Sequence, residues 1–248
     1  PSDPTLYPET TIILGLAKQG SVVTFANGEG RDTVLMGVTI AWGVAEYGGG
    51  IRCEDASPTI SHCIIRTNHV SSFGGGIDCL GGSPAILTCV VRDNVAFGTS
   101  AFGAGMNFED ASPEITDSII RNNSSMGAGG GIAYSNSSGT ILNSFLLNNS
   151  AVGGSGQIDL DASSPTITNC TILVEDSTPS RDGGVCAFNG SNPTITNSIL
   201  WGNGDDLFGC SATYSCIEDG DGGEGNLRAL PAFTQGPEGS YFLSQTVA

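Results

Sequence analysis

Three acidic residues recur in a segment that the sequence repeats, and their chemistry suits the cleavage of a glycosidic bond. Glu54, Asp78 and Glu109 precede the proline of a Ser-Pro dipeptide by four to six residues. Two carboxyl groups supply the acid and the base or nucleophile of glycoside hydrolysis. Asp55 and Asp110 come one residue later, so Glu54, Asp55, Glu109 and Asp110 also offer the oxygen ligands that calcium takes. Solvated acids on a strand and its turn are the plain alternative to both hypotheses.

A column of arginines is the second group with binding chemistry. Arg66, Arg92 and Arg121 each follow the repeat proline by eight residues, so stacked copies would align their guanidinium groups. Such a column suits sulfated or carboxylated sugars, because guanidinium binds planar anions through paired hydrogen bonds. The alternative is that neighbouring Asp and Asn residues offset the charge and the column serves solubility. The predicted sugar-binding residues are Arg52, Arg66, Arg92, Arg121, Asp159 and Asp161.

Histidines and cysteines point to structure more than to catalysis. His62 stands where other copies have Asn143, Asn169 and Asn197, which favours a turn position over an acid-base role. No serine or cysteine has a convincing His and Asp partner, so nucleophilic catalysis is not indicated. His69 is the only other histidine.

The eight cysteines divide into two sets. Cys53 aligns with Cys79, and Cys63 with Cys89, so these stack as small inward hydrophobes that could still oxidise if their Cβ atoms approach. Cys210 and Cys216 lie outside the repeat in CSATYSC and are the predicted disulfide of an exported protein.

Six copies of one unit establish the organisation of the chain. They align on Pro58, Pro84, Pro113, Gly139, Pro165 and Pro193, at spacings of 26, 29, 26, 26 and 28 residues. In every copy, alternate positions before the anchor are apolar, which is typical of a strand with one buried face. These two columns contain Ile51, Ile77, Met106, Ile132, Ile158 and Cys186, then Cys53, Cys79, Phe108, Tyr134, Leu160 and Phe188. A residue period near 27 therefore indicates a solenoid.

An amide column supports the same fold. Ten positions after the anchor stand Asn68, Asn94, Asn123, Asn149 and Asn203, with Glu175 as the single departure. Inward amides at a bend can hydrogen-bond to those above and below, as in stacked parallel strands. We expect an all-β, single-stranded, right-handed parallel β-helix of about nine coils of roughly 27 residues, which gives a rod about 45 Å long. One domain would span 1–248, with an irregular or first coil at 1–20 and irregular or capping coils at 204–248.

Composition and charge narrow the partners. The net charge is −17, with 25 acids against 8 bases, so nucleic acid and anionic membranes are excluded as expected partners. The sequence contains no run of about 18 apolar residues, so it predicts no membrane span. The opening PSDPTLYPET is not a signal peptide, so we expect a mature secreted product or an excised piece. Uncapped solenoid ends would pair with loops, with further domains or with a second copy of the chain.

The repeat resembles a known fold family. The GGGI, SPTIxxC and terminal Asn pattern is similar to the parallel β-helix repeat of the pectin-lyase-like superfamily, in bacterial secreted and surface proteins. The GGGI and xxxN pairing also resembles polymorphic outer-membrane adhesins. The resemblance implies the fold, but the superfamily includes polysaccharide lyases, hydrolases, tailspikes and adhesins. A calcium-assisted lyase would need one of the arginines as its base.

Three functions follow as expectations. The first is an exported or cell-surface rod that binds polysaccharide or surface glycan without catalysis. The second is a calcium-assisted polysaccharide lyase or a glycoside hydrolase that acts along the first-strand face, and the third is a spacer. Extra residues between copies place a groove rim near Phe97, Phe102, Arg181 and Asp182. Two TIT triplets at 166–168 and 194–196 resemble ice-binding arrays, although ordinary β-propensity accounts for them.

Overall fold

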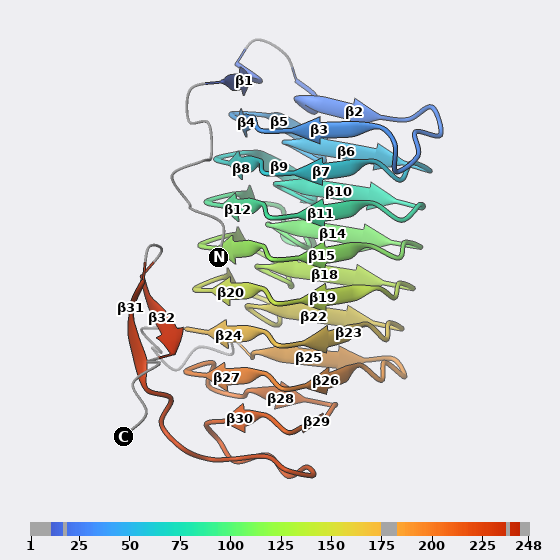
Figure 1. Cartoon of the computed structure of the whole chain (residues 1–248). Coiled ribbons are helices and arrows are strands. Elements are labelled where there is room, and N and C mark those ends of the chain that lie inside the picture. Colours follow the sequence, from blue (N-terminus) through green and yellow to red (C-terminus); the bar gives the residue numbers. More distant parts are fainter. Residues whose placement is uncertain (1–10, 17–18, 175–182, 237–238, 244–248) are drawn as a thin grey trace.

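The computed structural model shows a parallel β-solenoid and describes residues 11–16, 19–174, 183–236 and 239–243 (Figure 1). These residues form strands and turns without a helix, in about seven turns. The expected number of nine turns assumes that the whole chain consists of repeats. In the structure, residues 218–232 are irregular and the last two strands form a hairpin. The all-β parallel solenoid predicted from the repeat is therefore confirmed, with fewer turns.

The rod contains four parallel sheets: sheets A, C and D run its length, whereas sheet B has five strands and ends at Ala151. Sheet A contains β1(Ile12–Leu14), β4(Thr39–Ala41), β8(Ile64–Arg66), β12(Val90–Arg92), β16(Ile119–Arg121), β20(Phe145–Leu147), β24(Thr171–Leu173), β27(Ile199–Trp201) and β30(Cys216–Ile217). Sheet B contains β5(Val44–Tyr47), β9(His69–Phe73), β13(Val95–Ala96), β17(Ser124–Ser125) and β21(Ser150–Ala151).

The other two sheets hold the first half of each repeat. Sheet C contains β2(Val23–Phe25), β6(Ile51–Glu54), β10(Ile77–Leu80), β14(Met106–Glu109), β18(Ile132–Ser135), β22(Ile158–Asp161), β25(Val185–Phe188) and β28(Leu207–Phe208). Sheet D contains β3(Val34–Met36), β7(Thr59–Ser61), β11(Ala85–Leu87), β15(Glu114–Thr116), β19(Thr140–Leu142), β23(Thr166–Thr168), β26(Thr194–Thr196) and β29(Ala212–Thr213). An antiparallel hairpin of β31(Phe233–Gly236) and β32(Gly239–Leu243) follows.

The register of sheet C confirms most of the predicted columns and corrects the last one. Ile51 pairs with Ile77, and Cys53 with Cys79, as the alignment requires. In β25, however, Val185 and Ala187 occupy the buried columns, instead of Cys186 and Phe188. The turn that follows β25 contains one residue more than its counterpart after β22, and Gly190 there has φ +82°. Counting backwards from Pro193 therefore shifts the assignment by one position.

The interior is a continuous apolar column between the sheets. Isoleucine is its most frequent residue, and the largest fully buried side chains are Tyr134 and Phe108. Their rings pack at 5.2 Å between centroids on neighbouring coils. Because strands alternate inward and outward side chains, each coil adds its own layer to this core.

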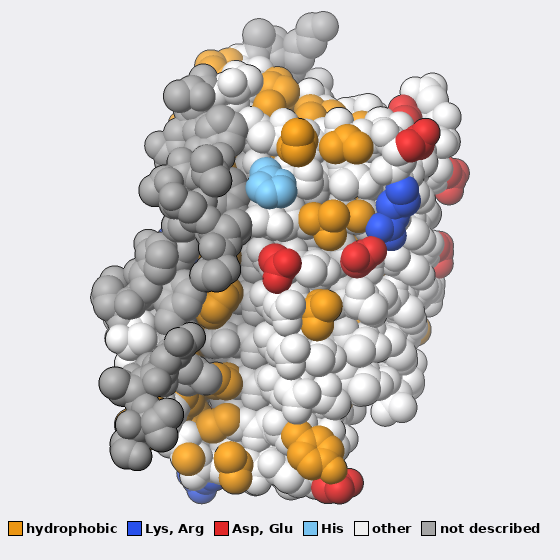
Figure 2. Space-filling view, in the orientation of Figure 1, with side chains coloured by type: hydrophobic (Ala, Val, Ile, Leu, Met, Phe, Trp, Pro, Cys, Tyr) orange, Lys and Arg blue, Asp and Glu red, His pale blue; other side chains and the backbone are white. Residues whose placement is uncertain are grey.

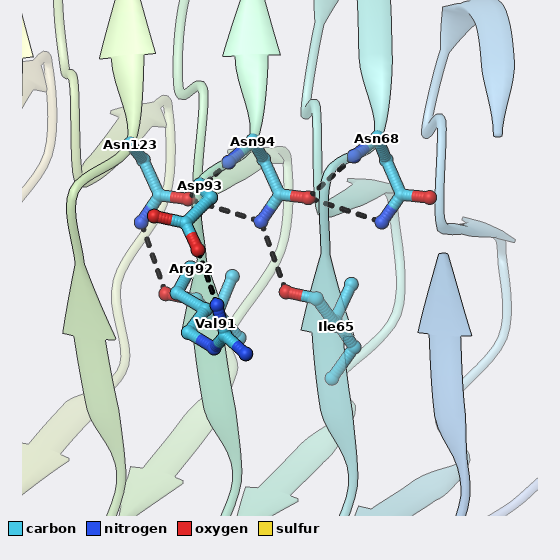
Figure 3. Close-up of polar contacts among 7 residues, drawn as sticks. All are labelled: Ile65, Asn68, Val91, Arg92, Asp93, Asn94 and Asn123. Atoms are coloured by element: carbon cyan, nitrogen blue, oxygen red, sulfur yellow. Dashed lines mark hydrogen bonds and ion pairs between the residues drawn. The ribbon is translucent and has the colours of Figure 1, made fainter. Parts of the chain in front are cut away.

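The predicted amide ladder is present at the bend between sheets A and B (Figure 3). The side-chain oxygen of Asn94 accepts hydrogen bonds from the backbone N–H and the side-chain amide of Asn68, both at 3.0 Å. Its own amide nitrogen donates to the Ile65 carbonyl and to the Asn123 oxygen, also at 3.0 Å. The hydrogen bonds of the buried Asn94 amide are thus all made by the neighbouring coils, which confirms the reason predicted for the column.

The ladder changes composition beyond its fourth member. Asn149 donates to the side-chain oxygen of Gln157 at 2.7 Å, so a glutamine from the following coil receives the bond. Gln157 in turn donates to the Leu173 carbonyl at 3.2 Å. Glu175, the predicted departure from the column, lies outside the described residues. Asn203 donates to Ile172 O at 3.0 Å, which is the bond that the other asparagines make.

The C-terminal segment covers two surfaces of the rod. Leu227 pairs with the last strand of sheet A, because Ile217 N donates to Leu227 O at 2.9 Å, and Tyr214 N donates to Glu224 O at 2.8 Å. This irregular chain covers the exposed edges of the last strands. The hairpin then lies beside sheet A (Figure 1), where Phe233 packs against a cluster that includes Leu147.

Candidate functional site

The outward side of sheet C carries a row of polar side chains that contact one another. Arg52, Asp78 and Asn107 align in register on β6, β10 and β14. One carboxylate oxygen of Asp78 accepts a hydrogen bond from the Arg52 guanidinium, and the other accepts one from the Asn107 amide at 2.9 Å. The three residues therefore form one hydrogen-bonded polar row across three coils.

Asp78 is buried, although the repeat predicted an exposed acid. Only 2% of its surface is accessible. The cause is the glycine turn that precedes the strand: a Cβ built on Gly74 would lie 2.4 Å from Asp78 Cβ, so the turn lies directly over this side chain. A glycine with φ +63° allows this close approach. The outward side of the strand is thus partly covered by a wall of chain.

Burial controls the ionisation of Asp78. Desolvation raises its pKa from 3.8 to about 6, although the Asn107 hydrogen bond and the Arg52 charge act in the opposite direction. The charges of Glu109 and Glu54 raise the pKa further. The structure thus brings Glu54 and Glu109 close enough to Asp78 for their charges to act on it.

The exposed pair of acids is separated by an apolar side chain. Glu54 and Glu109 both pair in register with Leu80, one on each side. Leu80 is 40% exposed and stands between them. Glu54 also accepts a hydrogen bond from Arg52 Nε at 2.9 Å. Two strand spacings of about 4.8 Å place the backbones of the two glutamates roughly 10 Å apart.

Three aromatic rings line the edge of this polar row. Tyr47, Phe73 and Phe102 stack on consecutive coils, with centroid separations of 5.6 Å and 5.8 Å. The Arg52 guanidinium carbon lies 4.7 Å from the centre of the Tyr47 ring. We call these three residues the aromatic ladder. Sequence reasoning named only Phe102, although each ring directly precedes a glycine turn at Gly48, Gly74 or Gly103.

A cleft of about 440 Å³ adjoins the aromatic ladder on sheet B. Its lining consists of Gln19, Gly20, Val44, Ala45, Glu46, Ser71 and Phe97. Phe97 is 53% exposed, which agrees with its predicted place at a groove rim. Glu46 connects the cleft to the ladder, because it directly precedes Tyr47 in β5, and the Glu46 carboxylate raises the pKa of that phenol. Arg181 and Asp182, the other predicted rim residues, lie outside the described residues.

The opposite end of sheet C also carries a buried aspartate near stacked aromatic rings. Asp159 is 7% exposed, and burial raises its pKa from 3.8 to about 6. Asp161 accepts a hydrogen bond from the Asn189 amide. Phe188 and Phe208 stack at 5.4 Å. The two predicted sugar-binding acids thus lie near a second aromatic pair, several coils from the aromatic ladder.

The predicted arginine column is present on sheet A. Arg92 pairs in register with Arg66 on one side and with Arg121 on the other. The Arg92 guanidinium forms an ion pair with Asp93, the next residue (Figure 3). Ala41 and Leu147 occupy the next positions and end the column. This agrees with the alternative in which neighbouring acids offset part of the charge.

The carboxylates that could share one ion differ from the predicted set. Asp55 and Asp110 occupy exposed turns, where their φ angles are 48° and 50°. Within the described part of the chain, the group whose ligand atoms all lie within 4.8 Å of one another is Asp205, Asp219 and Asp221. Glu54, Asp55, Glu109 and Asp110 are not part of this group, and calcium binding by them stays a prediction.

The cysteines stack as predicted, and all eight are thiols. Cys79 pairs in register with Cys53, and a hydrogen bond from Cys89 lowers the pKa of Cys63 to about 7. The predicted Cys210–Cys216 disulfide is not formed in the structure. Cys210 Sγ lies 3.7 Å from Val185 O, and Cys216 Sγ lies 3.0 Å from Ala229 O, so the two thiols contact different segments.

The two remaining sequence hypotheses concern His62 and the threonines. His62 has φ 51°, which matches Asn143 and Asn197 at the same bend and confirms the predicted turn position. The threonine triplets lie side by side in β23 and β26. Figure 2 shows few charged side chains over sheet D, but Glu114 and Leu142 interrupt the threonine columns in earlier coils. The regular array is therefore short.

No family model, curated protein or solved structure matches this chain. Within the described residues, no helix is long and apolar enough to span a membrane.

Proposed function

We propose that this protein is a carbohydrate-binding rod that holds a glycan on sheet C beside the aromatic ladder. The observation that carries the proposal is the contact between the ladder and the polar row of Arg52, Asp78 and Asn107. Sugar rings present apolar C–H faces and hydroxyl groups, so they suit aromatic surfaces flanked by a few fixed polar groups.

The mutual hydrogen bonds support a binding role for the polar row. Asp78 is held from both sides, and Arg52 is fixed by Asp78, by Glu54 and by the Tyr47 ring. Side chains fixed before binding lose little conformational entropy when a ligand arrives. Phe102 is 37% exposed and gives the ladder an accessible end.

Glycan-array binding tests the proposal. The protein should bind at least one class of oligosaccharide, and Phe73→Ala should reduce that binding because Phe73 contacts both other rings. Phe208→Ala is the matched control, since it removes a stacked ring at the far end of sheet C. Array silence of the wild-type protein would contradict the proposal and favour a spacer.

Glycoside hydrolysis is the second candidate, and the raised pKa of Asp78 is the observation that favours it. A carboxyl group with a pKa of about 6 could donate a proton to a leaving group, with Glu109 nearby. Both oxygens of Asp78 accept hydrogen bonds, however, which favours a fixed acceptor over a proton donor. Reducing-end release and absorbance of unsaturated product, with and without a chelator, separate hydrolase, calcium-assisted lyase and binding protein.

An exported or cell-surface location in a bacterium, and membership of the pectin-lyase-like superfamily, belong to the same proposal. Its support is the combination of a repeat that resembles that superfamily with a parallel β-solenoid. Surface labelling of the source cells tests the location. Labelling found only after cell lysis would contradict it.

A further inference from the structure

We infer that the cleft on sheet B binds an ammonium group of an amino sugar, so that the preferred ligand is a glycan with free amino groups. This inference rests on the proposed carbohydrate-binding function and names its ligand class. Glu46 of the cleft and Tyr47 of the aromatic ladder are consecutive residues of β5, so one oligosaccharide can contact both surfaces.

The charge of the lining favours a cation. Among the described residues that line the cleft, Glu46 is the one charged side chain, and it is exposed. Gln19 and Ser71 add neutral hydrogen-bonding groups. The exposed Glu46 carboxylate offers two oxygens with several lone pairs, so an ammonium group can bind it with charge-assisted hydrogen bonds.

The neighbouring surface has the same sign of charge. Glu54, Asp78 and Glu109 lie on the adjoining part of sheet C, where the charges of Glu54 and Glu109 act on Asp78. Arg52 is already engaged by two of these acids and by the Tyr47 ring. A uronate or sulfated sugar would therefore meet acids here without an uncommitted arginine, and the net charge of −17 would repel it further.

The aromatic rings supply the second half of the recognition. The stacking of Arg52 on Tyr47 at 4.7 Å shows that the ladder accommodates a cation on a ring face. Phe97 offers another exposed ring inside the cleft. An ammonium group between a carboxylate and an aromatic face gains both ion pairing and cation–π attraction. The apolar face of the same sugar can pack on Val44, which is 44% exposed.

Matched hexasaccharides test this inference by isothermal titration calorimetry at low salt. The glucosamine hexamer should bind roughly tenfold tighter than the N-acetylglucosamine hexamer, and the difference should shrink at high salt. Glu46→Gln should weaken binding of the glucosamine hexamer about fivefold and leave the acetylated hexamer unchanged. Phe97→Ala should weaken the glucosamine hexamer by a similar factor.

The chain provides a matched control for Glu46. Glu224 is another exposed glutamate beside a tyrosine, and it accepts a hydrogen bond from the Tyr214 hydroxyl at 2.5 Å, but it lies in the C-terminal cap. Glu224→Gln should leave both affinities unchanged.

The outcomes distinguish this inference from the proposed function. Equal or tighter binding of the acetylated hexamer, lost in Phe73→Ala but retained in Glu46→Gln, would overturn the amino-sugar inference and leave carbohydrate binding intact. Absence of binding by both hexamers, together with a silent glycan array, would overturn both.

Discussion

The amide column inside the rod and the polar row outside it use similar side chains for different purposes. Asn68, Asn94 and Asn123 are identical on successive coils and bond to the asparagines of the neighbouring coils and to nearby backbone. On the outer side of sheet C, the same three coils carry three different side chains, which are arginine, aspartate and asparagine. Repetition therefore marks the scaffold, whereas variation between coils marks the candidate site.

Removing one asparagine from the inner amide column should give the largest loss of stability. Asn94→Ala would leave the Asn68 backbone N–H, the Asn68 amide and the Ile65 carbonyl without their present partner inside the core. Each unsatisfied buried group costs about 1–3 kcal/mol, so we expect the free energy of unfolding to fall by roughly 3–5 kcal/mol. Urea denaturation followed by circular dichroism measures the loss.

An exposed asparagine provides the control for this prediction. Asn192→Ala changes an exposed side chain after β25 and should alter the free energy of unfolding by less than about 0.5 kcal/mol. Equal destabilisation by the two substitutions would show that the ladder has no special role in the scaffold.

The two buried aspartates on the outer side of sheet C, Asp78 and Asp159, should make the stability of the protein depend on pH. The folded-state pKa values of Asp78 and Asp159 are about 6, above the usual 3.8, so protonation of either group favours folding. Their stabilisation is complete below pH 4 and is lost as the pH rises through 6. Each contributes up to about 3 kcal/mol to that slope. Chemical denaturation at several pH values measures this effect. Between pH 4 and 7, the free energy of unfolding should fall less for the double variant Asp78→Asn, Asp159→Asn than for the wild-type protein.

The pH dependence of the double variant can also contradict this account. A double variant that retains the whole slope would show that Asp78 and Asp159 are not desolvated by the wall of glycine turns. Asn192→Ala should retain the wild-type slope, because it changes no ionisable group.

The smallest expected effect concerns the irregular tail. Because all eight cysteines are thiols, reductant should leave the thermal unfolding midpoint unchanged, and a denatured, unreduced sample should titrate eight thiols. A count of six thiols, with a midpoint lowered by reductant, would show that the Cys210–Cys216 disulfide forms. The tail would then be covalently fixed, unlike the coils.

Most of the fold follows from local patterns in the sequence. Alternating apolar positions, Ser-Pro anchors and the column from Asn68 to Asn149 predict the strands and bends, because each coil repeats the contacts of the one before. The last coil is misaligned because one inserted residue near Gly190 changes the count. The position of the hairpin against sheet A depends on Phe233, whose long-range packing has no repeated signal.

The candidate site is less predictable than the fold. Glu54, Asp78 and Glu109 could be grouped from their columns, but the burial of Asp78 depends on a turn that lies outside the strand pattern. Tyr47, Phe73 and Phe102 carry a usable signal, since an aromatic residue directly precedes a glycine turn on three successive coils. A search restricted to charged residues misses that signal.

The central claim is that the variable outer face beside the aromatic ladder binds carbohydrate. The most direct test is calorimetric titration with the tightest oligosaccharide from the array, comparing Phe102→Ala with Phe208→Ala. Both substitutions remove an exposed stacked ring from the same rod. We predict that Phe102→Ala weakens the affinity by about tenfold and that Phe208→Ala leaves it unchanged. Equal effects of the two substitutions, or a loss confined to Phe208→Ala, would contradict the claim.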